Sequence, residues 1–117
     1  MQTTNEKIKQ IQDDMRSGVI IAPQDIARNH SICAGEYCFC CAEMAELEII
    51  KNTEIEANRH TNDCKSDAQA ERQFFQGELG EQYIRLKYKL KALERLLSSL
   101  KLAVENAKRE WGNNKEF

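Results

Sequence analysis

The chain has 117 residues, of which 31% are charged and 41% hydrophobic, and its formal net charge at pH 7 is −2. This length suits one domain with a modest core, and one proline and five glycines exclude a turn-rich sandwich or barrel. The longest apolar run, residues 19–22, is far shorter than the roughly 20 residues of a membrane span. Because residues 1–6 also lack a signal-peptide pattern, we expect a cytoplasmic protein.

Residues 1–35 predict short N-terminal helices. Ile8, Ile11 and Met15 recur at helical spacing, and a Ser-Gly pair at 17–18 ends that pattern. Pro23 suits the first turn of a second helix. Gly35 either breaks this second helix or is carried inside it.

Residues 36–65 predict an acidic helix and a loop. Residues 36–56 hold six glutamates against Lys51 alone, a net charge of −5. The apolar positions fall mostly on one side of a helix, namely Tyr37, Cys40, Cys41, Met44, Leu47, Ile50 and Ile55. The polar stretch 58–65 is rich in turn-forming residues and is the candidate hairpin loop.

Residues 66–112 predict a capped helix followed by a basic heptad helix, with 113–117 as a tail. Ser66 and Gln69 have the spacing of a capping box, and Gly77 and Gly80 predict a kink or short break. From residue 79 to residue 111, apolar side chains alternate at spacings of four and three: Leu79, Tyr83, Leu86, Leu90, Leu93, Leu97, Leu100, Val104, Ala107 and Trp111. Gly112 and two asparagines predict the end of this helix.

These elements together predict an all-α fold in a single domain, residues 1–117. The acidic helix and the basic helix attract each other if they fold back as an antiparallel pair. We therefore expect a long, coiled-coil-like antiparallel hairpin that turns near residues 58–65, with the short N-terminal helices packed on it.

Several short segments resemble a set of small helical proteins encoded by tailed phages and prophages. The segments are IAPQDI at 21–26, AGEY at 34–37, KSD at 65–67 with Arg72, LKYKLKALE at 86–94 after Gly80, and SSLK at 98–101. Such proteins are often encoded near replication and recombination genes. The resemblance implies a mobile-element origin, a host bacterial cytoplasm and a non-catalytic role. The cysteines at 38–41 depart from it.

Two Cys and His pairs have the spacing of zinc ligands. Cys38 and Cys41 form C-x2-C, and His60 and Cys64 form H-x3-C after eighteen intervening residues. If 42–57 form one helix, about 27 Å separates the pairs along its axis. One chain then closes the site only if the helix breaks near 51–53, whereas an antiparallel dimer could join pairs from two copies. Alternatively, the cysteines are core residues.

Catalytic chemistry has little support in the sequence. A Cys–His pair without an orienting acid or an oxyanion hole does not make a nucleophilic site. The segment Gly77-x-x-Gly80 lacks the Lys-Ser/Thr ending of a phosphate loop. We therefore expect no enzyme.

The outer face of the basic helix is the predicted partner-binding surface. It carries basic, aromatic and aliphatic residues at helical steps: Ile84, Tyr88, Lys91, Arg95, Leu102 and Arg109. A second reading is that another helix or a second copy covers Ile84, Tyr88 and Leu102, so a homodimer stays open.

Three functions follow from these observations. The first is protein binding, as an inhibitor of a host nucleic-acid-targeting defence complex or as an accessory of phage recombination or replication. The second is binding of single-stranded nucleic acid by the basic helix. The third is a zinc-stapled structural module.

Overall fold

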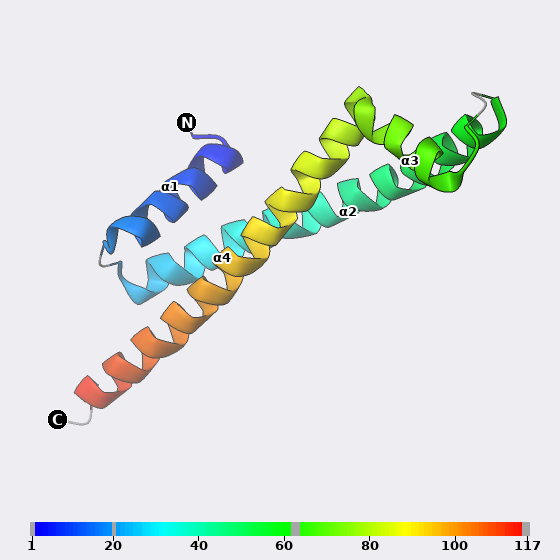
Figure 1. Cartoon of the computed structure of the whole chain (residues 1–117). Coiled ribbons are helices and arrows are strands. Elements are labelled where there is room, and N and C mark those ends of the chain that lie inside the picture. Colours follow the sequence, from blue (N-terminus) through cyan, green and yellow to red (C-terminus); the bar gives the residue numbers. More distant parts are fainter. Residues whose placement is uncertain (1, 20, 62–63, 116–117) are drawn as a thin grey trace. The chain divides into compact units, whose positions relative to one another are not determined.

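A computed structural model of the chain describes residues 2–19, 21–61 and 64–115, without the side chains beyond residue 109. Nearly all of these residues belong to helices, and no strand occurs among them. In chain order the helices are α1 (Thr4–Ser17), α2 (Pro23–Thr61), α3 (Asp67–Gln76) and α4 (Glu78–Lys115) (Figure 1). The all-α prediction is confirmed.

The predicted first helix, α1, has defined caps at both ends. The Thr3 hydroxyl accepts a hydrogen bond from the backbone N–H of Glu6, and the Glu6 carboxylate accepts one from the N–H of Thr3. This capping box satisfies two of the backbone donors that a helix start leaves without a partner. Gly18 ends the helix in the left-handed region, at φ 70°, which glycine adopts without a steric penalty. Ile8 and Ile11 are buried.

Helix α2 begins at Pro23 as predicted, but it does not end near Gly35. It continues for 39 residues to Thr61, so the predicted boundary between residues 35 and 36 lies inside one helix. Gly35 is exposed, and a side chain there would meet no atom within 4 Å. A glycine costs a helix about 1 kcal/mol relative to alanine, which lowers its stability without interrupting it.

Helix α3 begins with the cap that the sequence predicts. The Ser66 hydroxyl accepts from the backbone N–H of Gln69 at 3.1 Å. The Gln69 side chain accepts from the N–H of Lys65, one residue before the position that completes a capping box. Arg59 of α2 donates to the carbonyl of Cys64 at 2.6 Å and pairs with Asp67 at 3.1 Å. These contacts hold the end of α2 against the start of α3.

The predicted break at the two glycines is confirmed between α3 and α4. The N–H of Gly77 donates to the Phe74 carbonyl, and α4 begins at the next residue. Gly80 packs directly on the last turn of α3. A Cβ atom at Gly80 would lie 2.5 Å from the Cα of Phe75 and would overlap the Phe74 carbonyl. The close approach of the two helices therefore requires glycine at position 80.

Helix α4 confirms the heptad pattern but continues past the predicted stop. The seam positions whose side chains are described are all buried or half-buried, and Leu96 next to the seam is buried as well. The side chain of Trp111 lies outside the described residues. The helix continues through Gly112 to Lys115. The predicted end at 112–114 and the tail 113–117 are thus wrong up to residue 115, because a single glycine does not forbid helix.

The contacts within the chain divide it into two compact units. Unit 1 comprises residues 1–38 and 92–117, and unit 2 comprises residues 39–91. The buried side chains of unit 1 include Ile8, Ile11, Cys33, Leu93, Leu96 and Leu100, and those of unit 2 include Cys40, Asn58, Cys64, Ala70, Phe74, Tyr83 and Leu86. The assignment of residues 1–117 to a single domain stays a prediction.

In each unit, considered by itself, the α2 and α4 segments run antiparallel. In unit 1 the Tyr37 hydroxyl donates to Glu94 at 2.9 Å. In unit 2 Glu48 meets Tyr83, and Glu43 lies near Lys89 further along α4. This pairing agrees with the predicted helical hairpin. None of the described helices is both long and apolar enough to cross a membrane.

Candidate interaction surface

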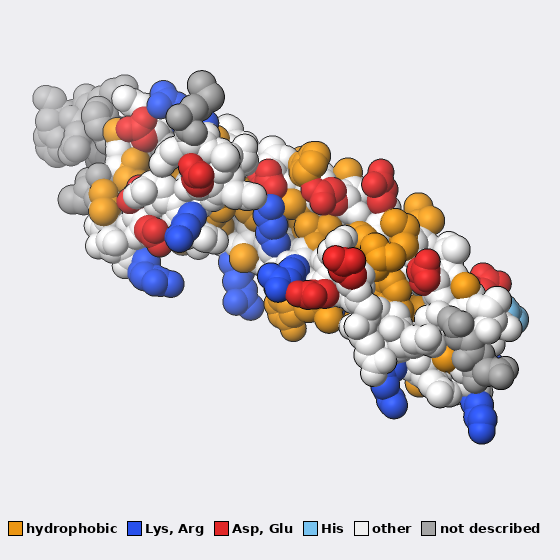
Figure 2. Space-filling model, turned by 90° about the horizontal axis from the view of Figure 1, so that it is seen from above, with side chains coloured by type: hydrophobic (Ala, Val, Ile, Leu, Met, Phe, Trp, Pro, Cys, Tyr) orange, Lys and Arg blue, Asp and Glu red, His pale blue; other side chains and the backbone are white. Residues whose placement is uncertain are grey.

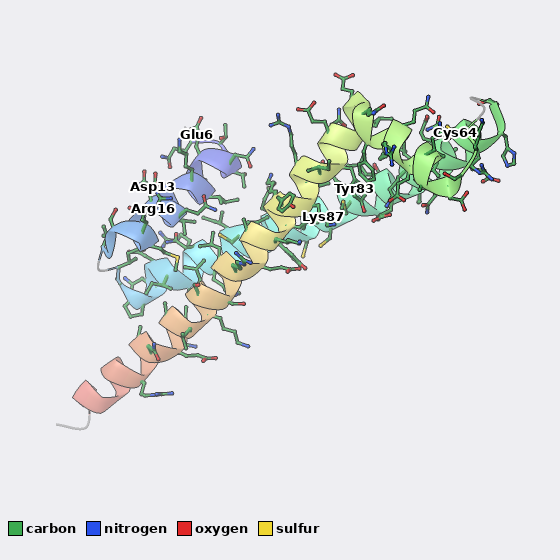
Figure 3. The ribbon with its side chains drawn as sticks, in the orientation of Figure 1. Glu6, Asp13, Arg16, Cys64, Tyr83 and Lys87 are labelled. Atoms are coloured by element: carbon green, nitrogen blue, oxygen red, sulfur yellow. The ribbon has the colours of Figure 1, made fainter. Side chains whose placement is uncertain are left out.

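Tyr83 anchors α4 against α2 and α3 in unit 2. Its hydroxyl donates to Glu48 Oε1 at 2.5 Å and accepts from Lys51 Nζ at 3.5 Å. The Lys51 ammonium also lies 4.7 Å from the centre of the Tyr83 ring and 5.7 Å from that of Phe75. A cation over aromatic faces is attracted to their negative potential. These contacts fix the side of α4 that faces α2 and α3 within unit 2; Figure 3 labels Tyr83 on α4.

The cluster also changes the acid–base behaviour of Tyr83. Its hydrogen bond to Glu48 is the largest cause that raises the pKa of the phenol, and burial raises it further. Both effects favour the neutral hydroxyl, because the phenolate would lose its donated hydrogen bond and would face a carboxylate. The tyrosine is thus a neutral structural donor.

The outer face of α4 in unit 2 is exposed, as predicted for a partner-binding surface. Ile84 is 42% exposed and Tyr88 is 63% exposed. The ammonium of Lys91 lies 5.3 Å from the centre of the Tyr88 ring, one helical turn along. No described part of unit 2 covers Ile84 or Tyr88. The alternative in which another helix of the chain covers them is therefore wrong within this unit.

The other three predicted partner-binding residues belong to unit 1. Arg95, Leu102 and Arg109 are all exposed on α4, and Leu102 is 58% exposed. Leu102 is a large apolar side chain that no described part of unit 1 covers. Each unit thus exposes its own share of the predicted surface.

The four predicted zinc ligands do not come together in the chain. Helix α2 has no break at residues 51–53, so Cys41 and His60 are separated by about 28 Å along its axis. Cys38, Cys41 and His60 are exposed, whereas Cys64 is buried and its thiol donates to Gln73 Oε1 at 3.0 Å. No group of three or more His, Cys, Asp or Glu residues in the described chain could hold a metal ion.

The single-chain zinc site is therefore wrong, because an unbroken helix keeps the two pairs apart. The route through an antiparallel dimer stays a prediction. Cys33 and Cys40 are fully buried core residues. Burial raises the pKa of the Cys33 thiol and so keeps it in its unreactive protonated form.

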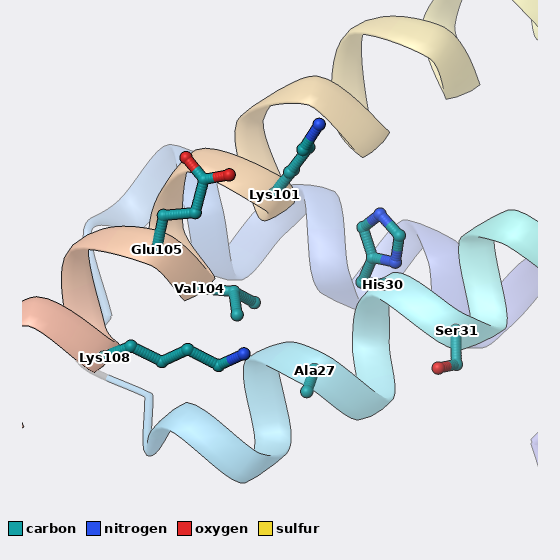
Figure 4. A pocket seen from close by; sticks show the side chains of 7 residues that line it. All are labelled: Ala27, His30, Ser31, Lys101, Val104, Glu105 and Lys108. Atoms are coloured by element: carbon teal, nitrogen blue, oxygen red, sulfur yellow. The ribbon is translucent and has the colours of Figure 1, made fainter.

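A cleft of about 340 Å³ lies in unit 1 between α2 and α4. Figure 4 shows Lys108 reaching from α4 toward Ala27 of α2, with Val104 on the α4 side of the cleft and His30 on the α2 side. Lys101, Glu105 and Lys108 are exposed, and Ala27 and Val104 supply apolar walls. With one acid among its bases, the cleft has no strong preference for an anion.

Helix α2 exposes apolar side chains in unit 2 that the sequence pattern did not indicate. Phe39 is 61% exposed, Ile49 is 67% exposed and Ile50 is 38% exposed. Ile50 and Cys41 were expected on the buried side, yet Cys41 is exposed. Figure 2 shows hydrophobic and acidic side chains interleaved over its right-hand part, which belongs to unit 2. In a helix this long, a short stripe of apolar residues on the outer face contributes little to the overall apolar pattern of the sequence.

Comparisons with known proteins identify no relative. No protein-family model matches the chain. No curated protein and no solved structure matches it either.

Proposed function

We propose that this chain is a non-catalytic protein-binding protein, which uses the outer face of α4 to hold an acidic partner surface. The observation that carries the proposal is the exposed pair of Tyr88 and Lys91, with the ammonium 5.3 Å from the ring centre and Ile84 one turn before. Tyrosine is enriched at the energetic centres of interfaces, because it offers a large, stiff and amphipathic contact area.

The charge of this face selects the kind of partner. Lys87 and Lys91 flank Tyr88 and are exposed. Cations in this position guide an acidic surface toward the face and oppose a basic one. The Lys91 ammonium also lies over the Tyr88 ring, and this cation–π contact favours the same placement of both side chains before a partner binds.

The altered pKa values of two described side chains fit a structural role for both. Burial raises the pKa of the Cys33 thiol, and the hydrogen bond to Glu48 raises the pKa of the Tyr83 phenol; both side chains lie in helix contacts. Catalytic sites typically gather several perturbed groups in one pocket. The raised pKa values of Cys33 and Tyr83 follow mainly from burial and from one structural hydrogen bond.

The biological setting of the proposal comes from the resemblance to phage proteins. A small helical phage protein of this kind would act on a host or phage nucleic-acid machine. We propose inhibition of a host nucleic-acid-targeting defence complex, or an accessory role in phage recombination or replication.

A pull-down from host lysate, with and without nuclease, tests the proposal. The bait is compared with a Tyr88→Ser variant and with an Ile49→Ser variant, which removes a similarly exposed apolar side chain from α2. We expect one stoichiometric protein that survives nuclease, that Tyr88→Ser loses and that Ile49→Ser retains. Equal recovery by the two variants would refute the assignment of the face.

Single-stranded nucleic acid is the second candidate, because the Tyr88 ring between two lysines could stack a base and contact phosphates. Residues 39–91 hold ten acids and eight bases, a net charge of −2, which opposes a polyanion. Nucleic-acid binding predicts that recovery collapses after nuclease treatment. It also predicts an affinity that falls steeply with salt.

A further inference from the structure

A cleft of about 330 Å³ lies along α3 in unit 2, and none of the described residues that line it is acidic. Its lining consists of Cys64, Gln69, Arg72, Gln73 and Gln76. The four other clefts in the described part of the chain each include at least one carboxylate. The cleft along α3 is therefore set apart from them by a guanidinium that no carboxylate in the lining neutralises.

The lining side chains of α3 share the outer side of this helix. Ala70 and Phe74 are buried and mark its inner side. Positions 69, 72, 73 and 76 differ by three, four and seven, so they lie together on the side opposite Ala70 and Phe74. Asp67 and Glu71, the two acids of α3, lie away from that outer side, and Asp67 is already paired with Arg59 at 3.1 Å.

Two hydrogen bonds orient the glutamine side chains of the cleft. The backbone N–H of Lys65 donates to Gln69 Oε1 at 2.9 Å, and the Cys64 thiol donates to Gln73 Oε1 at 3.0 Å. A carboxamide has one oxygen acceptor and one NH₂ donor group. Because both oxygens are occupied and neither NH₂ group donates to a described residue, the donor ends of Gln69 and Gln73 are left for a ligand.

Arg72 adds the positive charge of the cleft. Its side chain is exposed and forms no hydrogen bond or ion pair with any described residue. A guanidinium is a planar group of N–H donors without an acceptor, and its fork matches the oxygens of a carboxylate or a phosphate. Arg72, Gln69 and Gln73 thus offer donors from three neighbouring side chains, which an anion with several oxygen acceptors would satisfy.

We propose that this cleft binds the phosphate group of a small phosphorylated molecule. A phosphate monoester has three strongly accepting terminal oxygens, one for each of the three donor side chains, whereas a carboxylate has two oxygens. The volume of about 330 Å³ lies within the range of about 300–1,000 Å³ for small-molecule sites, so it holds more than the phosphate. The net charge of −2 over residues 39–91 disfavours a polyanion and favours a ligand with a single phosphate group.

The phosphate site does not rest on the proposed function. Its residues lie on α3 and at Cys64, whereas partner binding was assigned to Ile84, Tyr88 and Lys91 on α4. Loss of phosphate binding and loss of partner capture are therefore separate results.

Nitrogen-15 NMR of the purified full chain tests the proposal, because it observes the donor groups themselves. The signals are the side-chain NH₂ groups of Gln69 and Gln73 and the Nε–H of Arg72. The probe is adenosine 5′-monophosphate at constant ionic strength, compared with adenosine, inorganic phosphate and acetate. We expect the monophosphate to shift all three signals in a saturable way and adenosine to leave them unchanged.

Two variants remove the site while conserving the fold. Arg72→Gln keeps a long polar side chain but removes the charge, and we expect the dissociation constant to rise at least about tenfold. Gln73→Glu retains an oxygen that accepts from the Cys64 thiol but places a carboxylate in the cleft, so we expect binding to be lost. Arg85→Gln is the matched control, because it removes one positive charge from unit 2 outside the cleft, where Arg85 pairs with Glu81.

Circular dichroism of each variant separates a lost site from a lost fold. Shifts that do not saturate in the wild type would overturn the proposal, and so would an Arg85→Gln protein that binds as weakly as Arg72→Gln, since net charge alone would then explain the shifts. Acetate bound as tightly as the monophosphate would refute a phosphate preference. Inorganic phosphate bound as tightly as the monophosphate would refute a ligand that extends beyond its phosphate group.

Discussion

The contact between Gly80 and the last turn of α3 makes a sharp prediction about stability. In the substitution Gly80→Ala the new Cβ atom lies 2.5 Å from the Phe75 Cα, whereas ordinary contacts begin at 3.4 Å. The two helices must separate by about 1 Å to relieve this overlap, and overpacking typically costs 1–3 kcal/mol. The obstructing atoms are backbone atoms, so we place the cost of the overlap at about 3 kcal/mol.

Alanine also has a better helix propensity than glycine, which offsets about 1 kcal/mol. We therefore expect a net loss of about 2 kcal/mol in the free energy of unfolding for Gly80→Ala. Gly35→Ala is the matched control, because Gly35 is helical and a Cβ there meets nothing within 4 Å. This control should gain about 0.5–1 kcal/mol.

Urea unfolding followed by circular dichroism at the helical band measures both variants. The expected gap between them is about 3 kcal/mol, or on the order of 10 °C in melting temperature. A Gly80→Ala protein as stable as Gly35→Ala would refute the close approach of α3 and α4. A change in the slope with urea would instead indicate that two-state unfolding is lost.

Three further predictions concern the caps, the thiols and the buried phenol. Ser66→Ala should cost about 1 kcal/mol, measured by urea unfolding, because the first turn of α3 loses its cap. The double substitution Cys38→Ser and Cys41→Ser should leave the melting temperature and the zinc content unchanged. Both thiols are exposed and lie apart from His60 and Cys64. A lower melting temperature or a lower zinc content in this variant would support the zinc-stapled module. The pKa of Tyr83 is raised in the fold, so its stabilising contribution is complete below the unfolded pKa of about 10 and is lost as the pH rises above that value. Urea titrations of wild type and Tyr83→Phe at neutral and alkaline pH should therefore differ by about 1 kcal/mol at neutral pH and converge in alkali.

The sequence by itself determined the helical class and most helix starts and turns. These features depend on neighbours in the chain. Gly18 ends α1, Ser66 caps α3, and Pro23 suits a first turn. The heptad seam of α4 was also readable, because the same face must be apolar at every turn wherever the helix packs.

The sequence did not predict correctly which glycines end a helix, because the effect of a glycine depends on what packs around it. Gly35 and Gly112 lie inside long helices, whereas Gly77 ends one. The intrinsic cost of glycine is similar at each position, about 1 kcal/mol. Packing decides the outcome at Gly77 and Gly80, where the backbone of α3 comes close, whereas a Cβ at Gly35 would meet nothing within 4 Å.

Only the tertiary structure decided which polar and apolar groups meet. The contact of Glu48 and Lys51 with Tyr83 joins residues more than thirty positions apart, and no spacing rule places them together. The same contacts set the rotation of each helix about its axis. Within this unit, Phe39 and Tyr88 are left exposed and Cys40 is buried. A sequence states which side chains share a helix face, but the partner helix determines whether that face meets protein or water.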